Sequence, residues 1–341
     1  MIRVAIAGCG AVSRLYYQPA LSMLEREGRL LVAAAYDPDL ESAQSFCRSF
    51  GTAHAMASFE EMIGRPLDLL IIASPPPFHR AQATAAFDAG LAVLCEKPLA
   101  LTVEDGEQMV EAARRAGRPL AVGMIRRRLR ATRMIRAMLS NGTLGTLRSI
   151  DIFEGGPFDW PVRSPAYFDR HAGGVGVFGD IGTHVMDLLR WWLGTPDRLA
   201  YADDAMGGIE ANCRLELAFG DCTVRTRLSR DWFRPNLYRF VGDRGWMIWP
   251  VDQPDQVELG LPAASSRARL AVDEMKGAED MWAGHPAGPF GAAFASQVMG
   301  IAGALDGGPD DYVNGDEGLA ALRLVESCRA VRTAMAMPWL K

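Results

Sequence analysis

The sequence lacks any apolar run that approaches the roughly 20 residues of a membrane-spanning helix. It has neither internal repeats nor low-complexity segments. Its first residues, Ile2 to Ala7, form a strand-like run without the basic start, long apolar core and cleavage site of a secretory signal. These absences favour a soluble globular protein with no membrane partner, and the cytoplasm is the expected compartment.

Metal ligands and positive charge are also scarce. The 6 cysteines lie far apart without metal-type spacing, and the 5 histidines show no convergent third ligand. Neither a disulfide framework nor a metal site is therefore expected. The formal net charge of -5 argues against nucleic acid as a partner. What the chain does have is size: 341 residues, 49% of them hydrophobic, can bury a substantial core and favour two domains.

The chain opens with the pattern of a strand, a glycine turn and a helix. Gly8-Cys9-Gly10 follows the first strand, and the apolar residues from Leu15 to Leu24 keep helical spacing. Gly8 permits a tight turn, and Gly10 lets the backbone approach a pyrophosphate at the positive end of the helix. Ser13 stands where such turns normally have a third glycine or an alanine.

Asp37 follows the second expected strand, Leu30 to Tyr36. Dinucleotide-binding folds place an acidic residue near this position to bind the adenosine ribose. A carboxylate there repels a 2′-phosphate and no arginine follows immediately, so the sequence favours NAD over NADP. The alternative is that Asp37 caps the helix that starts near Leu40. One side chain cannot readily do both, and the glycine turn upstream favours ribose binding.

Two further strands end in turns that suit a cofactor. Leu67 to Ala73 runs into a proline-rich turn that ends at His79, which either contacts the nicotinamide or packs at the next helix start. Ala92 to Cys95 runs into Glu96-Lys97-Pro98, at the strand end where parallel sheets bind ligands. A lysine held by a proline turn can direct its ammonium at a substrate oxygen, although a solvated Lys-Pro turn is the simpler alternative.

Alternating strands and helices with short links predict a doubly wound parallel sheet, a Rossmann domain over residues 1–123. The basic run from Arg126 to Arg133 follows the last of these strands and is expected to open a helix that ends at Asn141-Gly142. Most of its arginines are expected on a solvated face. Arg126 and Arg127, closest to the strand end, are candidates to bind phosphate or hydroxyl groups of a substrate.

The second half, residues 124–341, changes to period-two runs that predict an α+β domain with a large, open-faced, mainly antiparallel sheet. Trp246 and Trp249 are expected on this sheet, which could join copies into a homo-oligomer, a dimer or a tetramer. Helices are expected over Pro289 to Leu305 and Asp316 to Met335. The expected strands are Leu147 to Phe153, Arg198 to Asp204, Glu210 to Phe219, Thr223 to Ser229, Leu237 to Val241 and Trp246 to Trp249.

A glycine-rich segment from Gly173 to His184 leads into a helix that continues to Leu193. If Asp180 begins the helix, His184 lies one turn later on the same face, where carboxylate and imidazole can act on one hydroxyl. The alternatives are a capping aspartate and a core histidine. The preceding segment supplies three candidates for substrate contact, although core aromatics are an equal alternative for two of them: Trp160, Arg163 and Tyr167.

Taken in order, these motifs resemble the glucose-fructose oxidoreductase, inositol dehydrogenase and rhizopine-catabolism (Gfo/Idh/MocA) family. The resemblance covers nearly the whole chain, and Glu-Lys-Pro followed by Asp-x-Gly-x-His is specific in combination. It implies NAD(P)-dependent oxidoreduction of a sugar-like small molecule by a catalytic trio of Lys97, Asp180 and His184. In that trio His184 is the general acid/base, Lys97 polarises the reacting oxygen, and Asp180 positions the hydroxyl or the histidine. Ser13, Ile125 and Arg130 depart from the family pattern.

The sequence thus predicts an NAD(P)-dependent oxidoreductase that interconverts a secondary alcohol and a ketone on a sugar, polyol or nucleotide-sugar. Two alternatives stay open: a non-redox enzyme of the same scaffold that retains NAD, such as a glycosidase, and a cofactor-binding regulator without catalysis. The residues expected to contact the cofactor are Gly8, Gly10, Ala11, Val12, Asp37, Ser74, Pro75, Pro76, His79, Glu96 and Lys97.

Overall fold

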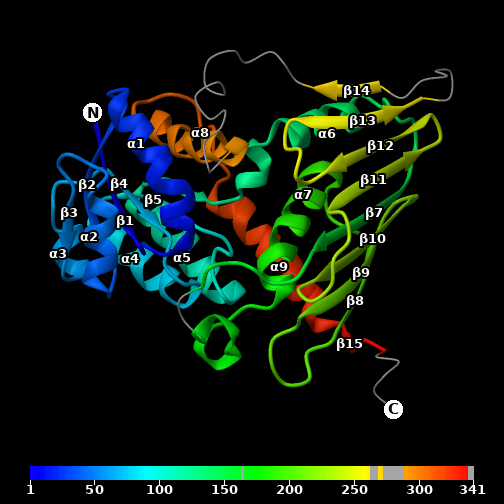
Figure 1. The fold of residues 1–341 in the computed structure, drawn as a ribbon, viewed down its shortest axis with the longest axis horizontal. Helices are drawn as coiled ribbons and strands as arrows, with labels where there is room; N and C mark the ends of the chain where they lie inside the picture. Colours follow the sequence, from blue (N-terminus) through cyan, green and yellow to red (C-terminus); the bar gives the residue numbers. More distant parts are fainter. Residues whose placement is uncertain (163–164, 262–267, 272–287, 337–341) are drawn as a thin grey trace. The chain divides into compact units, whose positions relative to one another are not determined.

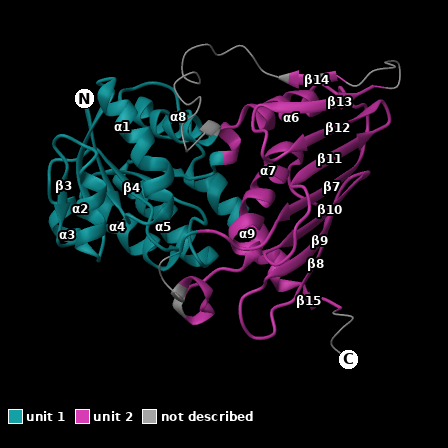
Figure 2. Cartoon of the chain, in the orientation of Figure 1, with its two compact units in different colours: residues 1–125, 161–164, 277–322 teal, residues 126–160, 165–276, 323–341 magenta. Residues whose placement is uncertain are grey.

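The structure is a computed structural model that describes residues 1–162, 165–261, 268–271 and 288–336. The chain divides into two compact units, coloured separately in Figure 2. The first consists of residues 1–125, 161–164 and 277–322, and the second of residues 126–160, 165–276 and 323–341.

A parallel sheet forms the centre of the first unit and confirms the predicted doubly wound fold. Among the described residues it has 6 strands in the order β3-β2-β1-β4-β5-β6 (Figure 1). The order reverses between β1 and β4, and such a reversal is the usual ligand-binding point of these sheets. The strands are β1 (Ile2–Ala7), β2 (Leu30–Tyr36), β3 (His54–Met56), β4 (Leu69–Ile72), β5 (Ala92–Cys95) and β6 (Leu120–Val122).

Helices connect these strands. Every residue of β4 and β5 is buried, because the connecting helices cover both faces of a parallel sheet. Side-chain caps fix several helix starts: Asp39, Ser58 and Thr102 accept hydrogen bonds from backbone amides of α2, α3 and α5. The helices are α1 (Gln18–Arg26), α2 (Leu40–Cys47), α3 (Phe59–Ile63), α4 (His79–Asp88) and α5 (Val103–Ala116).

Part of the carboxyl-terminal sequence belongs to the first unit. Helix α8 (Gly288–Leu305) packs against α1 and the π-helical turn Ser13–Tyr17 that precedes it. The ring of Phe294 in α8 stacks on Tyr16 and meets Tyr17 edge-on, each at a centroid distance of 4.9 Å. No helix within the described ranges combines the length and apolar character needed to cross a membrane.

The second unit is built on a mixed sheet of 9 described strands, in the order β14-β13-β12-β11-β7-β10-β9-β8-β15. Most neighbours are antiparallel as expected, but β7 and β10 are parallel, and so are β8 and the edge strand β15. The first of these parallel pairs is the central one. Its parallel direction follows from the connection: a crossover containing helix α7 (Thr183–Leu193) follows β7, and such a crossover lets two strands run in the same direction. The strands are β7 (Leu147–Gly155), β8 (Arg198–Asp203), β9 (Asn212–Phe219), β10 (Cys222–Ser229), β11 (Leu237–Gly242), β12 (Gly245–Pro250), β13 (Gln256–Gly260), β14 (Ala268–Ala271) and β15 (Arg332–Ala334).

Helices α6 (Arg130–Ser140) and α7 lie on one face of this sheet (Figure 1). The core between them contains Trp192, Tyr238 and Trp249, whose rings meet at centroid distances of 4.9 to 6.4 Å. Trp249 is fully buried there, so the expectation that it contributes to a surface between copies is wrong. Trp246 points to the opposite face and is half-buried, because side chains alternate along a strand.

The helix expected from the basic run is present and ends at Ser140, next to the expected Asn141-Gly142, but it begins later than expected. Ile125–Arg128 forms a short 3-10 turn, and α6 begins only at Arg130. Within this turn Arg127 forms a buried ion pair: it donates to both carboxylate oxygens of Asp187 in α7, with the shortest contact at 2.7 Å. Because 5% or less of either side chain is exposed, each charge depends on the other for its solvation.

The end of the chain also differs from the prediction. Helix α9 (Gly315–Ala330) ends before Met335, and Arg332–Ala334 becomes the edge strand β15 beside β8. Arg332 donates to the carboxylate of Asp203 in β8 over 2.7 Å. This ion pair and the parallel strand pairing replace the last helical turn.

Candidate active site

The glycine turn after β1 is tightly packed at its first position. Gly8 has φ of +93°, and a Cβ built there would lie 2.5 Å from the backbone nitrogen of Ser74. Only glycine fits such a position. The departure at Ser13 has a clear role, because its buried hydroxyl donates to the Gly8 carbonyl over 2.5 Å. Serine therefore closes the turn here by a hydrogen bond, where glycine or alanine would do so by close packing.

The other side of the turn is open. Gly10 is exposed, and a Cβ at this position would meet no atom within 4 Å, so packing within the chain does not demand a glycine. The space fits the close approach of a phosphate group to the backbone, with Ala11 and Val12 at the following helical turn. Arg14, which the sequence analysis did not select, adds a guanidinium 3.4 Å from the Cys9 carbonyl.

Asp37 lies beside the same turn. One carboxylate oxygen accepts from the Cys9 amide over 2.8 Å, and the other accepts from the Asp39 amide over 2.9 Å. The helix cap of α2 is Asp39, so the capping alternative for Asp37 is wrong. Gly10, the amides of the turn and the Asp37 carboxylate together suit the pyrophosphate and ribose of a dinucleotide.

The turn after β4 ends in a histidine that packs inside the first unit. His79 is fully buried, and its ring nitrogens lie 2.8 Å from the Ser74 carbonyl and 3.1 Å from the Pro98 carbonyl. Burial lowers the pKa of His79, so the ring is neutral at pH 7. These surroundings match the packing alternative. Ser74 donates to Gln82, Pro75 is exposed and Pro76 is half-buried.

The turn after β5 is organised by a buried carboxylate. Glu96 is 7% exposed and accepts from the Tyr17 hydroxyl over 2.7 Å and from the Lys97 amide over 3.1 Å. Gln297 of α8 donates to the Tyr17 hydroxyl over 3.2 Å. Burial, and then the Glu96 carboxylate, raise the pKa of Tyr17, which keeps its hydroxyl available as a donor. Gly123 leaves room for the carboxylate, since a Cβ there would lie 2.9 Å from it.

Lys97 extends from this turn and is half-buried. The sequence contains only three lysines, at positions 97, 276 and 341, and nearly all its cationic side chains are arginine. A lysine at a strand end is therefore an unusual choice for this chain. An ammonium is a compact point charge that can also release a proton, whereas a guanidinium stays charged.

The start of α7 presents Asp180 and His184 in the second unit. A π-helical turn, Phe178–Gly182, precedes the helix, and Glu210 fixes it by accepting from the Phe178 amide over 2.9 Å. Asp180 lies in this turn, and His184, 9% exposed, follows one turn later. The tight packing of Glu210 requires a glycine at position 176, where a Cβ would lie 2.2 Å from the carboxyl group.

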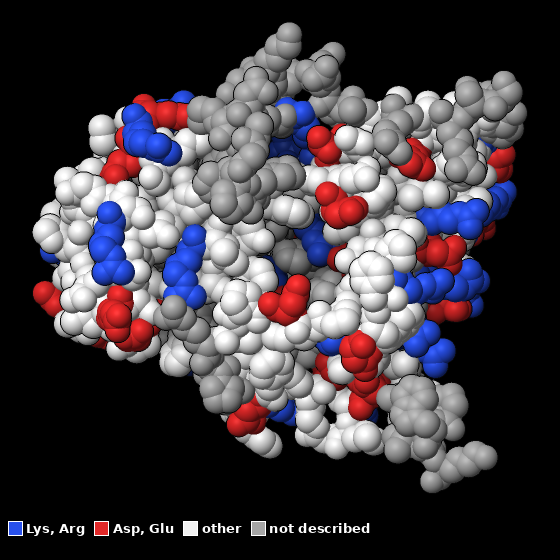
Figure 3. Space-filling model, viewed as in Figure 1, with Lys and Arg blue, Asp and Glu red and all other residues white. Residues whose placement is uncertain are grey.

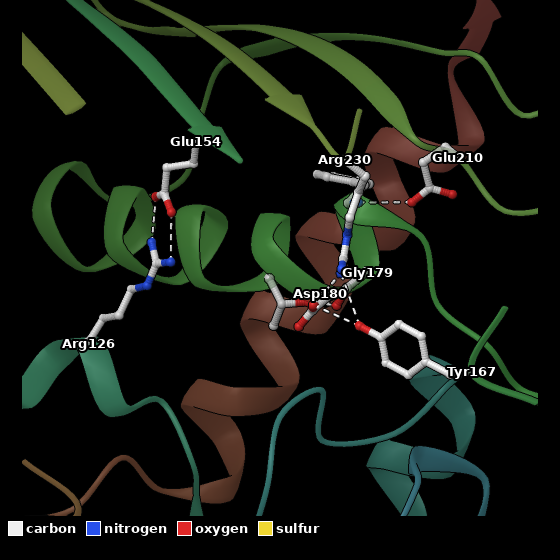
Figure 4. Close-up of polar contacts among 9 residues, drawn as sticks. Arg126, Glu154, Tyr167, Gly179, Asp180, Glu210 and Arg230 are labelled. Carbon is white, nitrogen blue, oxygen red and sulfur yellow. Dashed lines mark hydrogen bonds and ion pairs between the residues drawn. The ribbon is translucent and has the colours of Figure 1, made fainter. Parts of the chain in front are cut away.

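Figure 4 shows two ion pairs in this region, one at the start of α7 and one farther along the helix. Arg230 and Tyr167 both donate to the carboxylate of Asp180. Arg126 donates to both oxygens of Glu154, at 2.5 and 2.7 Å, and the Tyr238 hydroxyl donates to the same carboxylate. Among the described residues no cluster of three acidic, histidine or cysteine side chains could hold a metal ion.

The residues predicted to contact the substrate differ in their burial and in their partners. Tyr167 lies at Asp180, Arg126 is held by Glu154, and Trp160 is half-buried. Arg127 is buried in its pair with Asp187 and does not line an open surface. Arg163 lies outside the described residues.

Several residues at these sites were missed by the sequence analysis. Arg230 directly follows strand β10, the same signal that selected Asp37 and Lys97, and could have been found by it. Tyr17 and Glu154 reach their partners across 79 and 28 residues of sequence, and no local pattern indicates such contacts.

The fold and the site together place the chain in a class of proteins: oxidoreductases that contain a dinucleotide-binding unit. Residues 2–124 match the model described as oxidoreductase family, NAD-binding Rossmann fold, and residues 132–248 match the GFO/IDH/MocA C-terminal domain. The chain belongs to the Gfo/Idh/MocA family of oxidoreductases, as its motifs predicted.

Named relatives of this chain are sugar and polyol dehydrogenases. It is 28% identical to D-apiose dehydrogenase from Paraburkholderia graminis, over 95% of this chain and 85% of the relative. It is 27% identical to inositol 2-dehydrogenase 3 from Saccharopolyspora erythraea, over 91% and 88%. A structure of an inositol dehydrogenase homolog with NAD+ from Azotobacter vinelandii has a TM-score of 0.81 and 25% identity, covering 97% of this chain and 95% of that one.

The two glycines of the turn give a matched pair of variants. Gly8→Ala is expected to lower the free energy of unfolding by about 1–3 kcal/mol, because of the positive φ and the contact with Ser74. Gly10→Ala is expected to change it by less than about 0.5 kcal/mol but to weaken NADH binding about tenfold or more. Urea unfolding and NADH fluorescence titration measure the two effects. Tight NADH binding by Gly10→Ala would contradict this account of the turn.

Proposed function

We propose that the protein is an NAD-dependent oxidoreductase that interconverts a secondary alcohol and a ketone on a free sugar or polyol. The first unit would bind the dinucleotide, and the second would bind the substrate. The observation that carries this proposal is the presence of Lys97 at a strand end of the Rossmann sheet together with Asp180 and His184 at the start of α7.

The preference for NAD rests on Asp37. Its carboxylate is oriented by the amides of Cys9 and Asp39 at the end of β2. A carboxylate fixed at this position accepts hydrogen bonds from the two ribose hydroxyls and repels a 2′-phosphate. The NAD+ in the inositol dehydrogenase homolog is consistent with this preference.

The proposed chemistry divides the reaction between cofactor and protein. A bound nicotinamide supplies the hydride acceptor or donor. In the direction of alcohol oxidation, the His184 imidazole takes the hydroxyl proton as the general base. The ammonium of Lys97 stabilises the negative charge that develops on the same oxygen. Asp180 orients the groups at the start of α7.

An uncharged, hydroxyl-rich substrate fits the second unit. Arg126 and Arg230 already donate to the carboxylates of Glu154 and Asp180, so neither presents an unbalanced positive charge to a phosphate. Paired carboxylates and guanidiniums offer acceptors and donors to the hydroxyl groups of a sugar. The relatives named for D-apiose and inositol are consistent with a substrate of this class.

We further propose that two copies associate through the outer face of the sheet in the second unit. In Figure 3, side chains of opposite charge alternate along the margin that β9 to β12 form. Strand pairing aligns one outward-facing residue from each of six neighbouring strands in a single row. From β12 to β8 the row reads Ile248, Arg239, Asp151, Arg225, Glu216 and Ala200.

The charges of this row are complementary to those of the same row read in the opposite order. A two-fold axis parallel to the strands, between β7 and β10, sets Asp151 opposite the partner's Arg225 and Arg239 opposite the partner's Glu216. A two-fold interface pairs residues in this reciprocal way. The apolar Ile248 and Ala200 meet at the ends of the row. Within one chain Arg225 already lies 3.9 Å from Asp151 and 3.8 Å from Glu216, so the row is held in place before association.

Substitution of the proposed catalytic residues tests the function. Lys97→Arg keeps the positive charge but changes its geometry, and His184→Asn removes the proton acceptor. Each is expected to lower kcat about 100-fold or more, and His184→Asn is expected to leave the affinity for NADH unchanged. Turnover is measured as NADH formation from NAD+ with myo-inositol or D-apiose, and Arg29→Gln at an exposed position is the control. Near-wild-type turnover in both variants would overturn the assignment.

The oligomer proposal predicts a dimer that depends on Arg225. The wild-type protein is expected to be dimeric at micromolar concentration in sedimentation or light scattering. Arg225→Glu sets two carboxylates opposite each other across the interface and is expected to weaken the dimer at least about tenfold. Arg29→Glu in the first unit is the matched control, and thermal unfolding monitors the fold. A monomeric wild type, or an Arg225→Glu dimer of unchanged strength, would contradict the proposal.

A further inference from the structure

Arg230 holds the carboxylate of Asp180 in the second unit. It follows directly after β10, and its guanidinium donates to the Asp180 carboxylate and, over 3.0 Å, to the Tyr167 hydroxyl. That hydroxyl donates to the same oxygen of Asp180 over 2.9 Å. Donors from two other segments therefore meet at one carboxylate oxygen of Asp180 (Figure 4).

Aromatic rings fix the guanidinium on its other side. Its central carbon lies 4.5 Å from the centre of the Phe158 ring and 5.8 Å from that of Tyr167. Phe158, Tyr167 and Phe168 pack together at centroid distances of 5.1 to 5.6 Å. The Arg230 side chain is 14% exposed. A planar, permanently charged guanidinium suits such a stacked position, and a lysine ammonium does not.

We propose that Arg230 is a positioning residue for the reaction: it keeps Asp180 ionised and fixed, so that Asp180 orients the reacting groups and His184 alone exchanges the proton. The inference rests on the proposed function, since it assigns roles within the same site. Arg230 acts through Asp180, because its guanidinium donates to Asp180 and to the Tyr167 hydroxyl.

The other groups that face Asp180 favour an ionised carboxylate. Arg126, from the turn before α6, interacts with it as a second positive charge. Burial, and next the charge of Asp180, raise the pKa of the Tyr167 phenol, so this group stays a neutral donor. On the same helix, His184 follows one turn later. In this arrangement the Asp180 carboxylate accepts hydrogen bonds at Oδ2, which favours its ionised form.

A double-mutant cycle separates this role from simple structural support. Arg230→Gln is expected to lower kcat for NAD+ with myo-inositol or D-apiose by about 10- to 100-fold and to move the acid limb of the kcat/KM profile to higher pH. In the Asp180→Asn background the same substitution is expected to have no further effect. Arg230→Lys should restore part of the rate. NADH affinity stays constant, and Arg29→Gln is the control.

Titration of labelled carboxyl groups by NMR provides a readout that needs no turnover. The Asp180 signal is assigned by its absence in Asp180→Asn, and in Arg230→Gln it is expected to titrate at a higher pH than in the wild type, because the ion pair with Arg230 favours the charged carboxylate. An unchanged titration, or full additivity in the cycle, would overturn the role of Arg230. Absence of turnover in the wild type would instead count against the proposed function, and the NMR titration would then decide the role of Arg230 by itself.

Discussion

The first unit depends on one buried carboxylate, that of Glu96. An ion of this kind is stable inside a protein only when donors satisfy it, because an unpaired buried charge costs several kcal/mol. The donors come from distant segments: Tyr17 belongs to the turn that follows the glycine motif, and Gln297 of α8 holds Tyr17 in place. The same carboxylate accepts from the amide of Lys97. The cofactor turn, the lysine turn and the carboxyl-terminal helix are therefore coupled through one group.

In the second unit, too, carboxylates are satisfied by hydrogen-bond donors from other segments. Arg230 and Tyr167 hold Asp180, Arg126 and Tyr238 hold Glu154, and the Phe178 amide holds Glu210. Each anion sits at or beside a strand end or a helix start, and each is matched by a donor from another segment. A site built this way is densely supplied with hydrogen-bond donors and acceptors. Such donors and acceptors are what the proposed polyhydroxyl substrate would require.

The sequence predicted what local chemistry determines. The glycine turn, Asp37, Lys97 and the spacing of Asp180 and His184 follow from strand ends and helix periodicity, and the six-stranded parallel sheet follows from alternating elements. It could not predict what tertiary contacts determine. The parallel pairing of β7 with β10 depends on the crossover, the burial of Arg127 depends on Asp187 far along the chain, and the edge strand after α9 depends on Asp203. His79 needed its buried surroundings to separate packing from binding.

The most direct test of the account is a parallel titration of the nucleotide-free protein with NADH and NADPH. The structure places the Asp37 carboxylate beside the glycine turn, oriented by two backbone amides. The account predicts that NADH binds at least about tenfold more tightly than NADPH, a difference of about 1.4 kcal/mol. Tighter binding of NADPH would contradict the role of Asp37. Failure to bind either nucleotide would contradict the oxidoreductase function itself.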